Sequence, residues 1–399
     1  MNKRKTSIYY YLLAALILLF GLGYFGWQNF SAKNSESGRQ QITLEFFNQK
    51  PEVAAGYQQL ADLYHKQHPN VRIRMTTIGQ GNGASALQAK FVAGDAPDLV
   101  MLGGLPEIDR YQSHLLTLKN LPLTKKILPS LLAGGTIKNR LVGIPVGIEC
   151  YGWAYNREVF RKAGIDPEKI KTYDQFVSVV KQLDSQKSRL GLTAVFGYNG
   201  ADSNVAASFA AQFLSQPFKN NLYNAYINQH LNWRNADRMK AYYSLIKRYN
   251  VKPILSVNYS NSVQDLLFNG KVAMIPQGNW IIPALDQARN GFSKNDLGML
   301  PYFVESGNSH IMTGSSWYVG ITDQHPSHVQ AAKAYLSWLY NSKEAMNIIV
   351  NDMRYVPPTK IFKPADCWIP FQKKFTVWAR AKMRSYRSIN NFLTVLLKK

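Results

Sequence analysis

The sequence contains little cysteine and histidine, and the common catalytic motifs are absent from it. It has 2 Cys and 7 His in 399 residues. A Gly-x-Ser-x-Gly elbow, a His-Glu-x-x-His helix, a Walker loop and a Cys-x-x-Cys pair are all missing. The sequence therefore gives no support to serine hydrolases, zinc peptidases, P-loop NTPases or dithiol oxidoreductases. A glycoside hydrolase stays open, because its two carboxylates need only be close in space, and nothing selects a pair among the 24 acidic residues.

The histidines include two pairs with i, i+3 spacing, His65 with His68 and His325 with His328. Such a pair can bind a metal ion only with further ligands. The sequence shows no third ligand near either pair. We therefore predict no metal and no cofactor.

Acidic residues are scarce, with 24 against 47 basic ones, which gives a formal charge of +23. Such a balance is typical of nucleic-acid-binding proteins. However, the basic residues are scattered, and no zinc-finger spacing or ribonucleoprotein motif accompanies them. We therefore expect no nucleic-acid partner. A basic surface would also be attracted to anionic lipids and wall polymers outside a cell.

Export is predicted by the N-terminus, where Lys3, Arg4 and Lys5 precede the uncharged stretch Thr6 to Trp27. The stretch is long enough to span a bilayer with its basic flank inside. Residues 1–30 are read as a membrane anchor or signal segment, with cleavage as the competing outcome. Residues 31–41 are polar and read as a linker.

Cys150 and Cys367 are the only cysteines. In an exported chain they could form one disulfide, and two unpaired buried thiols are the alternative. The spacing does not decide between them, because it does not fix their separation in space.

After the linker, the pattern predicts an α/β sheet. Residues 42–47 and 71–76 read as strands, and between them Tyr57, Leu60, Ala61 and Tyr64 mark one face of a helix. Strand, helix and strand in this order predict parallel pairing. The first strand ends in Asn48 and Gln49, which we take as candidate ligand-binding residues.

The most informative stretch is Asp265 to Pro283, DLLFNGKVAMIPQGNWIIP. It reads as the end of a helix, a stop at Asn269-Gly270, a buried strand from Val272 to Ile275, and a turn that presents Asn279 and Trp280. In open α/β sheets, ligands lie outside the carboxyl ends of strands. The turn is therefore a candidate binding element, although a lone Trp more often only packs.

Four segments together closely resemble the extracellular solute-binding proteins of carbohydrate ABC transporters, the maltose and multiple-sugar-binding type. They are Asp265 to Pro283, Leu141 to Phe160 with Gly143, Pro145, Tyr155 and Asn156, the AGDAPDLVM run 93–101, and MTGSSWYVGI 312–321. The resemblance spans residues 41 to 365. It implies a two-lobed type II periplasmic-binding-protein fold of the α/β class with three interlobe crossings, at 141–160, 296–302 and 354–360. Lobe 1 would hold residues 42–148 and 300–352, and lobe 2 residues 149–299 and 353–399.

The same resemblance implies roles for particular residues. Trp280 would stack on a sugar ring, and Glu149 would hold sugar hydroxyls, as in maltose-binding relatives. A Glu in an apolar run is costly to bury unpaired, so Glu149 needs either an internal Arg or Lys or a ligand. The full predicted ligand-binding set is Asn48, Gln49, Glu149, Tyr151, Tyr198, Asn199, Asn279, Trp280, Gly314, Ser315, Ser316, Trp317 and Trp368.

The resemblance implies a receptor that captures a sugar by hinge closure and delivers it to an ABC transporter permease at the extracellular face of the membrane, as a monomer and not an enzyme. Two features depart from the family. No lipid-modified Cys follows the N-terminal segment, and Leu102, Gly103 and Gly104 stand where some relatives carry a stacking aromatic. The alternatives are a receptor for an anionic solute on the same fold and a membrane-anchored glycan-processing enzyme.

Overall fold

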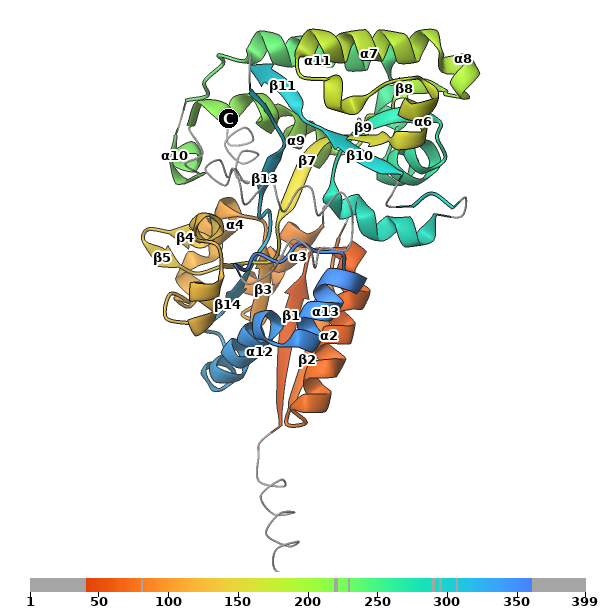
Figure 1. The fold of residues 1–399 in the computed structure, drawn as a ribbon. Coiled ribbons are helices and arrows are strands. Elements are labelled where there is room, and N and C mark those ends of the chain that lie inside the picture. The colour runs from red at the N-terminus through yellow and green to blue at the C-terminus, as the bar shows by residue number, and fades with distance from the viewer. Residues whose placement is uncertain are drawn as a thin grey trace, which may run out of the picture.

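The computed structural model describes residues 41–79, 82–218, 222–228, 230–288, 291–293, 296–305 and 308–360. Within these residues the chain forms two lobes, each built around its own sheet (Figure 1). The predicted N-terminal segment and Cys367 and Trp368 in the tail lie outside the described residues. In the described part of the chain, no helix combines the length and apolar character needed to cross a bilayer.

The first lobe holds a five-stranded sheet in the order β2-β1-β3-β14-β6. Strands β1, β2 and β3 are parallel, as the strand, helix and strand order predicts, and β14 runs antiparallel to β3 and β6. The strands are β1 (Ile42–Asn48), β2 (Val71–Thr77), β3 (Leu99–Leu102), β6 (Ile144–Pro145) and β14 (Tyr318–Ile321), with the β4 (Thr136–Ile137) and β5 (Arg140–Leu141) hairpin beside them.

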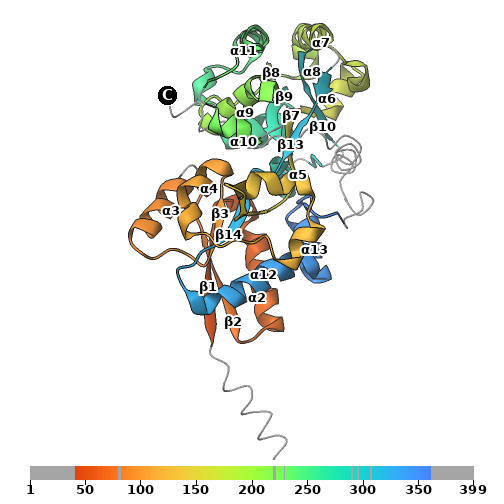
Figure 2. The ribbon, with the colours of Figure 1, turned by 90° about the vertical axis from the view of Figure 1, so that its left-hand side faces the viewer.

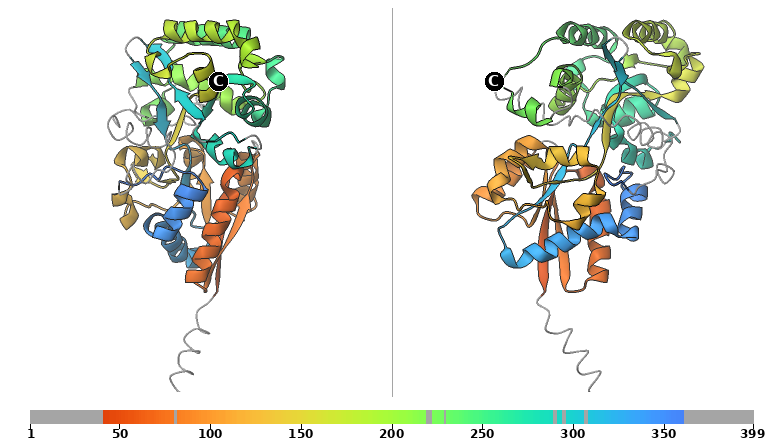
Figure 3. Two further views of the ribbon diagram at one scale, coloured as in Figure 1. Left: turned by 45° about the vertical axis from the view of Figure 1, so that its right-hand side comes forward. Right: turned by 60° about the vertical axis from the view of Figure 1, so that its left-hand side comes forward.

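Helices pack on the first sheet through apolar stripes. The predicted face Tyr57, Leu60, Ala61 and Tyr64 is buried on α2 (Ala54–Gln67). Helix α12 (Val329–Asn341) lies next to α2, and the rings of Tyr64 and Tyr335 meet edge-on at 4.9 Å (Figure 3). The other helices of this lobe are α3 (Gly83–Val92), α4 (Leu105–Tyr111), α5 (Pro129–Leu132) and α13 (Lys343–Asn347), with the π-helix η11 (Ile348–Asp352).

The second lobe is built around β7 (Glu149–Asn156), which is buried along its whole length. One edge of β7 pairs with β9 (Val272–Gly278), which also pairs with β8 (Ala194–Phe196). The other edge pairs with β10 (Leu297–Leu300) and then with β13 (Met312–Gly314). Strands β11 (Tyr302–Glu305) and β12 (Asn308–His310) form a hairpin, and the helices are α6 (Arg157–Lys162), α7 (Tyr173–Ser185), α8 (Lys187–Leu190), α9 (Ser203–Leu214), α10 (Leu222–Ile227) and α11 (Ala236–Tyr249).

Short 3-10 turns connect these elements. They are η1 (Pro51–Val53), η2 (Gln112–His114), η3 (Pro122–Lys126), η4 (Ala133–Gly135), η5 (Pro167–Lys169), η6 (Gln216–Phe218), η7 (Ile254–Ser256), η9 (Asn279–Gln287) and η10 (Pro326–His328).

The stretch Asp265 to Pro283 folds as predicted, with a longer strand. A π-helix, η8 (Asn261–Phe268), ends before Gly270, whose φ of +62° lies in the left-handed region that glycine tolerates. Strand β9 continues to Gly278, past the predicted end at Ile275. At Gly278 a Cβ atom would lie 2.1 Å from the Trp280 ring and 2.4 Å from the Cys150 carbonyl oxygen, so only glycine fits this turn.

The backbone passes between the two sheets at two places within the described residues, at 146–149 between β6 and β7 and at 314–318 between β13 and β14 (Figure 2). The predicted crossing at 296–302 is wrong, because β10 pairs with β7 and Tyr302 and Phe303 are buried in the second lobe. An apolar run shows that a segment is buried, but it does not say in which core.

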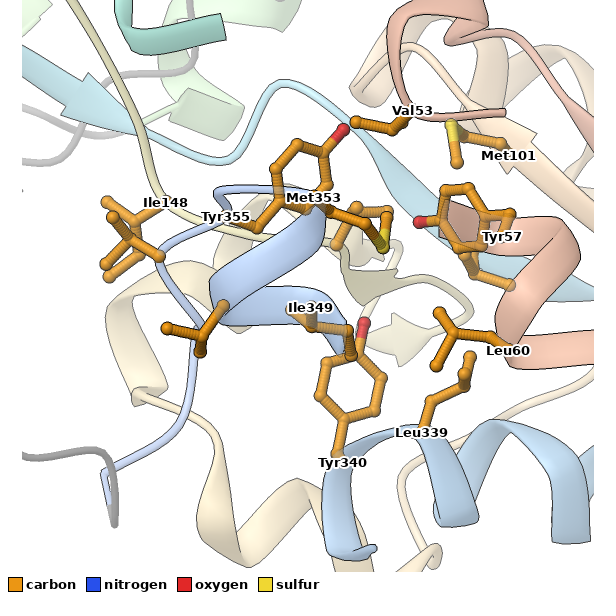
Figure 4. Packing of buried hydrophobic residues seen from close by; sticks show 14 of the residues in the cluster. Val53, Tyr57, Leu60, Met101, Ile148, Leu339, Tyr340, Ile349, Met353 and Tyr355 are labelled. Atoms are coloured by element: carbon orange, nitrogen blue, oxygen red, sulfur yellow. The ribbon is translucent and has the colours of Figure 1, made fainter. Parts of the chain in front are cut away.

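The segment 354–360 does not cross either. Ile148 N donates to Val356 O, Leu128 N donates to Pro358 O, and Lys360 N donates to Lys126 O, so this segment lies along the first lobe and the first crossing. The assignment of residues 353–360 to the second lobe is therefore wrong. Figure 4 shows Met353 and Tyr355 packed with Tyr57, Tyr340 and Ile148.

Candidate functional site

Two groups of side chains meet where the lobes join. The first, the Lys50 cluster, combines charges with two rings and consists of Lys50, Glu52, Glu149, Trp317 and Tyr355. The second, the Trp280 stack, is aromatic and consists of Tyr151, Trp280 and Tyr302. Glu149 and Tyr151 are two residues apart on β7, which links the two groups.

In the Lys50 cluster, Lys50 follows the end of β1, and its Nζ lies 2.8 Å from Glu149 Oε1 and 2.8 Å from Glu52 Oε1. The same Nζ lies 5.8 Å from the ring centroid of Trp317 and 5.7 Å from that of Tyr355, within the range of cation–π attraction. Only 4% of Lys50 is exposed. The ion pair with Glu149 is therefore buried from solvent, and it joins the first lobe to the start of β7.

The protonation of Lys50 follows from its partners. Burial by itself lowers the pKa of Lys50, but the Glu149 and Glu52 carboxylates oppose it and hold that pKa well above its ordinary value. Lys50 is therefore a cation at neutral pH. With one Lys and two Glu, the formal charge of the cluster is +1 − 2 = −1.

In the Trp280 stack, Tyr151 and Tyr302 are buried in the second lobe, and Trp280 is the outer ring. Trp280 is partly buried and packs against two hydrophobic clusters, one that extends from the first lobe into η8, β9 and η9, and one within the second lobe. Its ring stacks on Tyr151 at 6.0 Å, and Tyr151 stacks on Tyr302 at 6.1 Å. The indole N–H donates to Gln277 Oε1 at 2.8 Å, which fixes the orientation of the ring.

The structure answers the question of how Glu149 is paired. Its partner is Lys50, a residue that sequence analysis did not select. Lys50 directly follows the selected Asn48 and Gln49, so the position after a strand end was the available signal. Glu52 and Tyr355 were also missed, and they carried no signal beyond their residue type.

Asn48 and Gln49 place Lys50 by bonds within the first lobe. Asn48 Oδ1 accepts from Lys50 N at 2.9 Å, and Asn48 Nδ2 donates to Lys50 O and Thr77 Oγ1. Gln49 Nε2 donates to Met101 O at 2.8 Å and Glu107 Oε2 at 2.9 Å. Both side chains are buried and hydrogen-bonded within the first lobe.

Asn279 also bonds to the backbone. Its Oδ1 accepts from Cys150 N at 3.0 Å, and its Nδ2 donates to Ile148 O at 3.3 Å. It therefore holds the first crossing against the start of η9. Cys150 is itself buried, and burial raises the pKa of its thiol, so the thiol stays neutral.

Tyr198 and Asn199 are buried in the second lobe. Tyr198 packs edge-on against Phe209 at 6.2 Å. Asn199 is 1% exposed, and with its amide assigned to suit its neighbours it donates to Val257 O at 2.7 Å and accepts from Tyr259 N at 3.1 Å. Asn199 therefore stabilises the loop before η8.

The segment Gly314 to Trp317 forms the second crossing. Gly314 pairs with Glu149 across β13 and β7, and Ser315 Oγ donates to Trp317 O at 2.8 Å. Ser316 is buried, while Trp317 is partly buried and reaches the Lys50 cluster. The structure thus brings Glu149, Gly314 and Trp317 together at the junction, whereas the predicted Trp368 lies outside the described residues.

A second contact between the lobes joins α10 to α4. The Tyr226 hydroxyl donates to Asp109 Oδ2 at 2.6 Å, and the ring packs against the first-lobe core that includes Leu105, Ile108 and Tyr111. Burial, reinforced by the Asp109 carboxylate, raises the pKa of Tyr226. Sequence analysis assigned neither residue a role.

The two histidine pairs differ in their surroundings. His325 and His328 do have a third potential ligand, Asp98, which lies far away in sequence. The pair His65 and His68 has none among the described residues, because His65 Nδ1 contacts Val71 O and His68 packs on Tyr64.

A cavity of about 350 Å³ lies on the first lobe. It is lined by residues from η3, α12, α13 and η11, among them Lys126, Tyr340, Met346 and Val350. Because it contains no residue of the predicted ligand-binding set, we do not assign it to that function.

A family model described as bacterial extracellular solute-binding protein matches residues 48–346. The chain is similar to a multiple sugar-binding protein of Streptococcus mutans, with 21% identity over 332 residues that cover 78% of this chain and 74% of that protein.

Solved structures show the same architecture. A chitin oligosaccharide binding protein superposes with a TM-score of 0.69 at 21% identity, over 88% of this chain and 90% of that one. RafE in complex with raffinose superposes with a TM-score of 0.66 at 17% identity, over 89% and 98%. These likenesses confirm the two-lobed fold.

Proposed function

This chain belongs to the bacterial extracellular solute-binding proteins, and we propose that it binds an oligosaccharide between its lobes and delivers it to the permease of an ABC transporter. Proteins of this family are receptors and not enzymes. Support for a sugar comes from the relatives, whose names specify multiple sugars, chitin oligosaccharides and raffinose.

The observation that carries the proposal is the position of Trp280. It is the partly exposed end of an aromatic stack, it lies where two hydrophobic clusters meet, and its orientation is fixed by Gln277. A fixed aromatic ring suits the apolar C–H face of a pyranose, because sugar sites combine aromatic surfaces with a few placed polar groups. Nearby, the Lys50 cluster offers carboxylate oxygens that can accept hydrogen bonds from sugar hydroxyls.

Capture would proceed by hinge closure about the two crossings, 146–149 and 314–318. Trp317 and Glu149 lie at these crossings, so a ligand that contacts them contacts the segments that must bend. A sugar that binds only the closed arrangement shifts the population toward it. A permease could then distinguish loaded from empty receptor by shape.

The Lys50 cluster argues against an anionic solute. Its cation is already paired with two carboxylates, and its formal charge of −1 would repel an anion. The same pairing argues against glycan hydrolysis, since a general acid must be a protonated carboxyl group and both Glu52 and Glu149 are ion-paired with the Lys50 cation.

We also propose that Thr6 to Trp27 anchors the receptor as a monomer to the outer face of the membrane. The uncharged length of this segment and its basic flank support the anchor. Removing residues 1–30 and adding a cleavable secretion signal should release the protein into the medium. Retention on the membrane without this segment would refute the anchor.

Sugar binding can be tested by calorimetry and thermal unfolding with raffinose, chitin oligosaccharides and neutral monosaccharides. A ligand that binds only the folded state raises the melting temperature by mass action. Trp280→Ala should abolish this rise. The matched control is Trp338→Ala, because Trp338 is also partly buried and also donates to a Gln oxygen at 2.8 Å, but it lies on α12 away from the junction.

Three outcomes would overturn the proposal. If Trp280→Ala and Trp338→Ala reduce the ligand-induced rise in melting temperature equally, the reduction reflects a loss of stability and not of a ligand contact. Stabilisation by phosphorylated or acidic sugars alone would favour the anionic-solute receptor. Release of new reducing ends from the oligosaccharides would favour the enzyme.

A further inference from the structure

Three potential metal ligands converge on the first lobe at the end opposite the Lys50 cluster. His325 Nδ1 lies 3.0 Å from Asp98 Oδ1, and His328 Nδ1 lies 2.9 Å from the same oxygen. All three ligand atoms lie within 4.8 Å of one another. Asp98 is 4% exposed, while the two imidazoles are partly exposed, so the group is open to solvent on one side only.

The fold fixes these residues from three directions. Asp98 directly precedes β3, and Thr322 directly follows β14, which pairs with β3. Thr322 N donates to Asp98 O at 3.0 Å, and Thr322 Oγ1 donates to Pro97 O at 2.8 Å. The turn η10 then leads from His325 to His328, at the start of α12.

The carboxylate of Asp98 is also oriented by the backbone. Glu45 N, in the middle of β1, donates to Asp98 Oδ2 at 2.8 Å, so Oδ1 is the oxygen that faces both imidazoles. A ligand oriented by a second hydrogen bond in this way is typical of metal sites.

The distances suit a transition-metal ion. With bonds of about 2.0–2.1 Å, tetrahedral ligands lie roughly 3.3 Å apart. The nitrogen atoms are 3.0 and 2.9 Å from the oxygen, a few tenths of an ångström short of this spacing, and they lie no more than 4.8 Å from each other. Two imidazoles and a carboxylate are ligands that Zn²⁺ accepts, with water in the fourth position.

We propose that Asp98, His325 and His328 bind one Zn²⁺ ion, or a divalent ion of similar preference. The ion replaces the protons that both Nδ1 atoms otherwise donate to Asp98. It joins β1, β3 and the start of α12, and so it stabilises the first lobe without touching the proposed sugar site. This inference does not depend on the proposed function.

The test is calorimetry of the untagged, EDTA-treated protein with Zn²⁺ and, as a hard-cation control, Mg²⁺. We expect one Zn²⁺ per chain, a higher melting temperature with Zn²⁺, and no response to Mg²⁺. His325→Gln and His328→Gln should each weaken Zn²⁺ binding by more than about tenfold, since loss even of a residue that only orients a ligand costs this much.

The chain supplies a matched control in His68→Gln, which changes a histidine with the same i, i+3 spacing and no carboxylate partner in the described structure. Its Zn²⁺ affinity should equal that of the wild type. Equal affinity in all four proteins, or no stoichiometric binding by the wild type, would refute the site. If a His variant fails to fold, the wild-type Co²⁺ complex decides instead: an intense visible absorption of tetrahedral Co²⁺ supports the site, and its absence refutes it.

Discussion

The two lobes contribute different chemistry to their junction. The first lobe presents polar side chains at the end of β1, and Asn48, Gln49 and Lys50 are all bonded within the protein. The second lobe presents the Trp280 stack, in which rings pack on rings. The first lobe therefore sets charge and geometry, while the second provides an aromatic surface. We expect changes in the first lobe to alter stability, and changes in the second to alter affinity.

Of the substitutions considered, Lys50→Met in the first lobe should lower the stability of the protein most. Removing the cation leaves Glu149 and Glu52 close together, with Glu149 buried and uncompensated, and breaking a buried ion pair in this way costs about 3–5 kcal/mol. Chemical denaturation should show the loss in the free energy of unfolding.

The control for this change is Lys162→Met, which removes an exposed Lys–Glu pair with Glu158. Exposed pairs contribute little because solvent screens them, so its stability should barely change. If Lys50→Met is as mild as the control, the Lys50 cluster does not hold the lobes together.

Asn279 is a polar residue beside the aromatic surface of the second lobe. Asn279→Ala tests whether it acts on stability, as the polar residues of the first lobe do. The change leaves Cys150 N and Ile148 O without their side-chain partner, and an unsatisfied buried group costs about 1–3 kcal/mol. The melting temperature of the ligand-free protein should fall, and a saturating sugar should still raise it and so recover part of the loss. Unchanged stability with lost affinity would instead make Asn279 a ligand contact.

Tyr226→Phe tests the second contact between the lobes. The change removes the hydrogen bond to Asp109, worth about 1 kcal/mol, and keeps the ring. Affinity should fall about fivefold, and small-angle scattering should show a more open ligand-free protein. Tyr243→Phe, on the exposed face of α11, is the control and should change neither quantity.

The smallest change in stability should come from Glu107→Gln. Glu107 Oε2 accepts hydrogen bonds from Gly103 N and Gln49 Nε2. Burial raises the pKa of Glu107 above its ordinary value, so the folded protein holds this proton to higher pH than the unfolded chain. Its contribution to stability is present in acid and is lost as pH rises through that raised pKa. Glu107→Gln should flatten this part of the stability profile, measured by denaturation from acidic to neutral pH. An identical slope in wild type and variant would contradict it.

Much of the fold could be predicted because local signals were strong. The parallel pairing of β1 and β2, the buried face of α2 and the turn at Gly270 all follow from periodicity and glycine. The second crossing could not be found in this way. Strands β10 and β11 read as apolar runs, and such runs look alike whether they are buried in the first or the second lobe.

By itself, the sequence determined which segments are strands and helices, which family the chain resembles, and that Glu149 needs a partner. Only the tertiary structure decided that the partner is Lys50, 99 residues away, and that Asp98 lies against His325 and His328. The reason is physical. Periodicity, capping and turn chemistry act over a few residues and can be read along the chain. The pairing of charges and ligands depends on which strand ends become neighbours, and strand order is set by packing across the whole lobe.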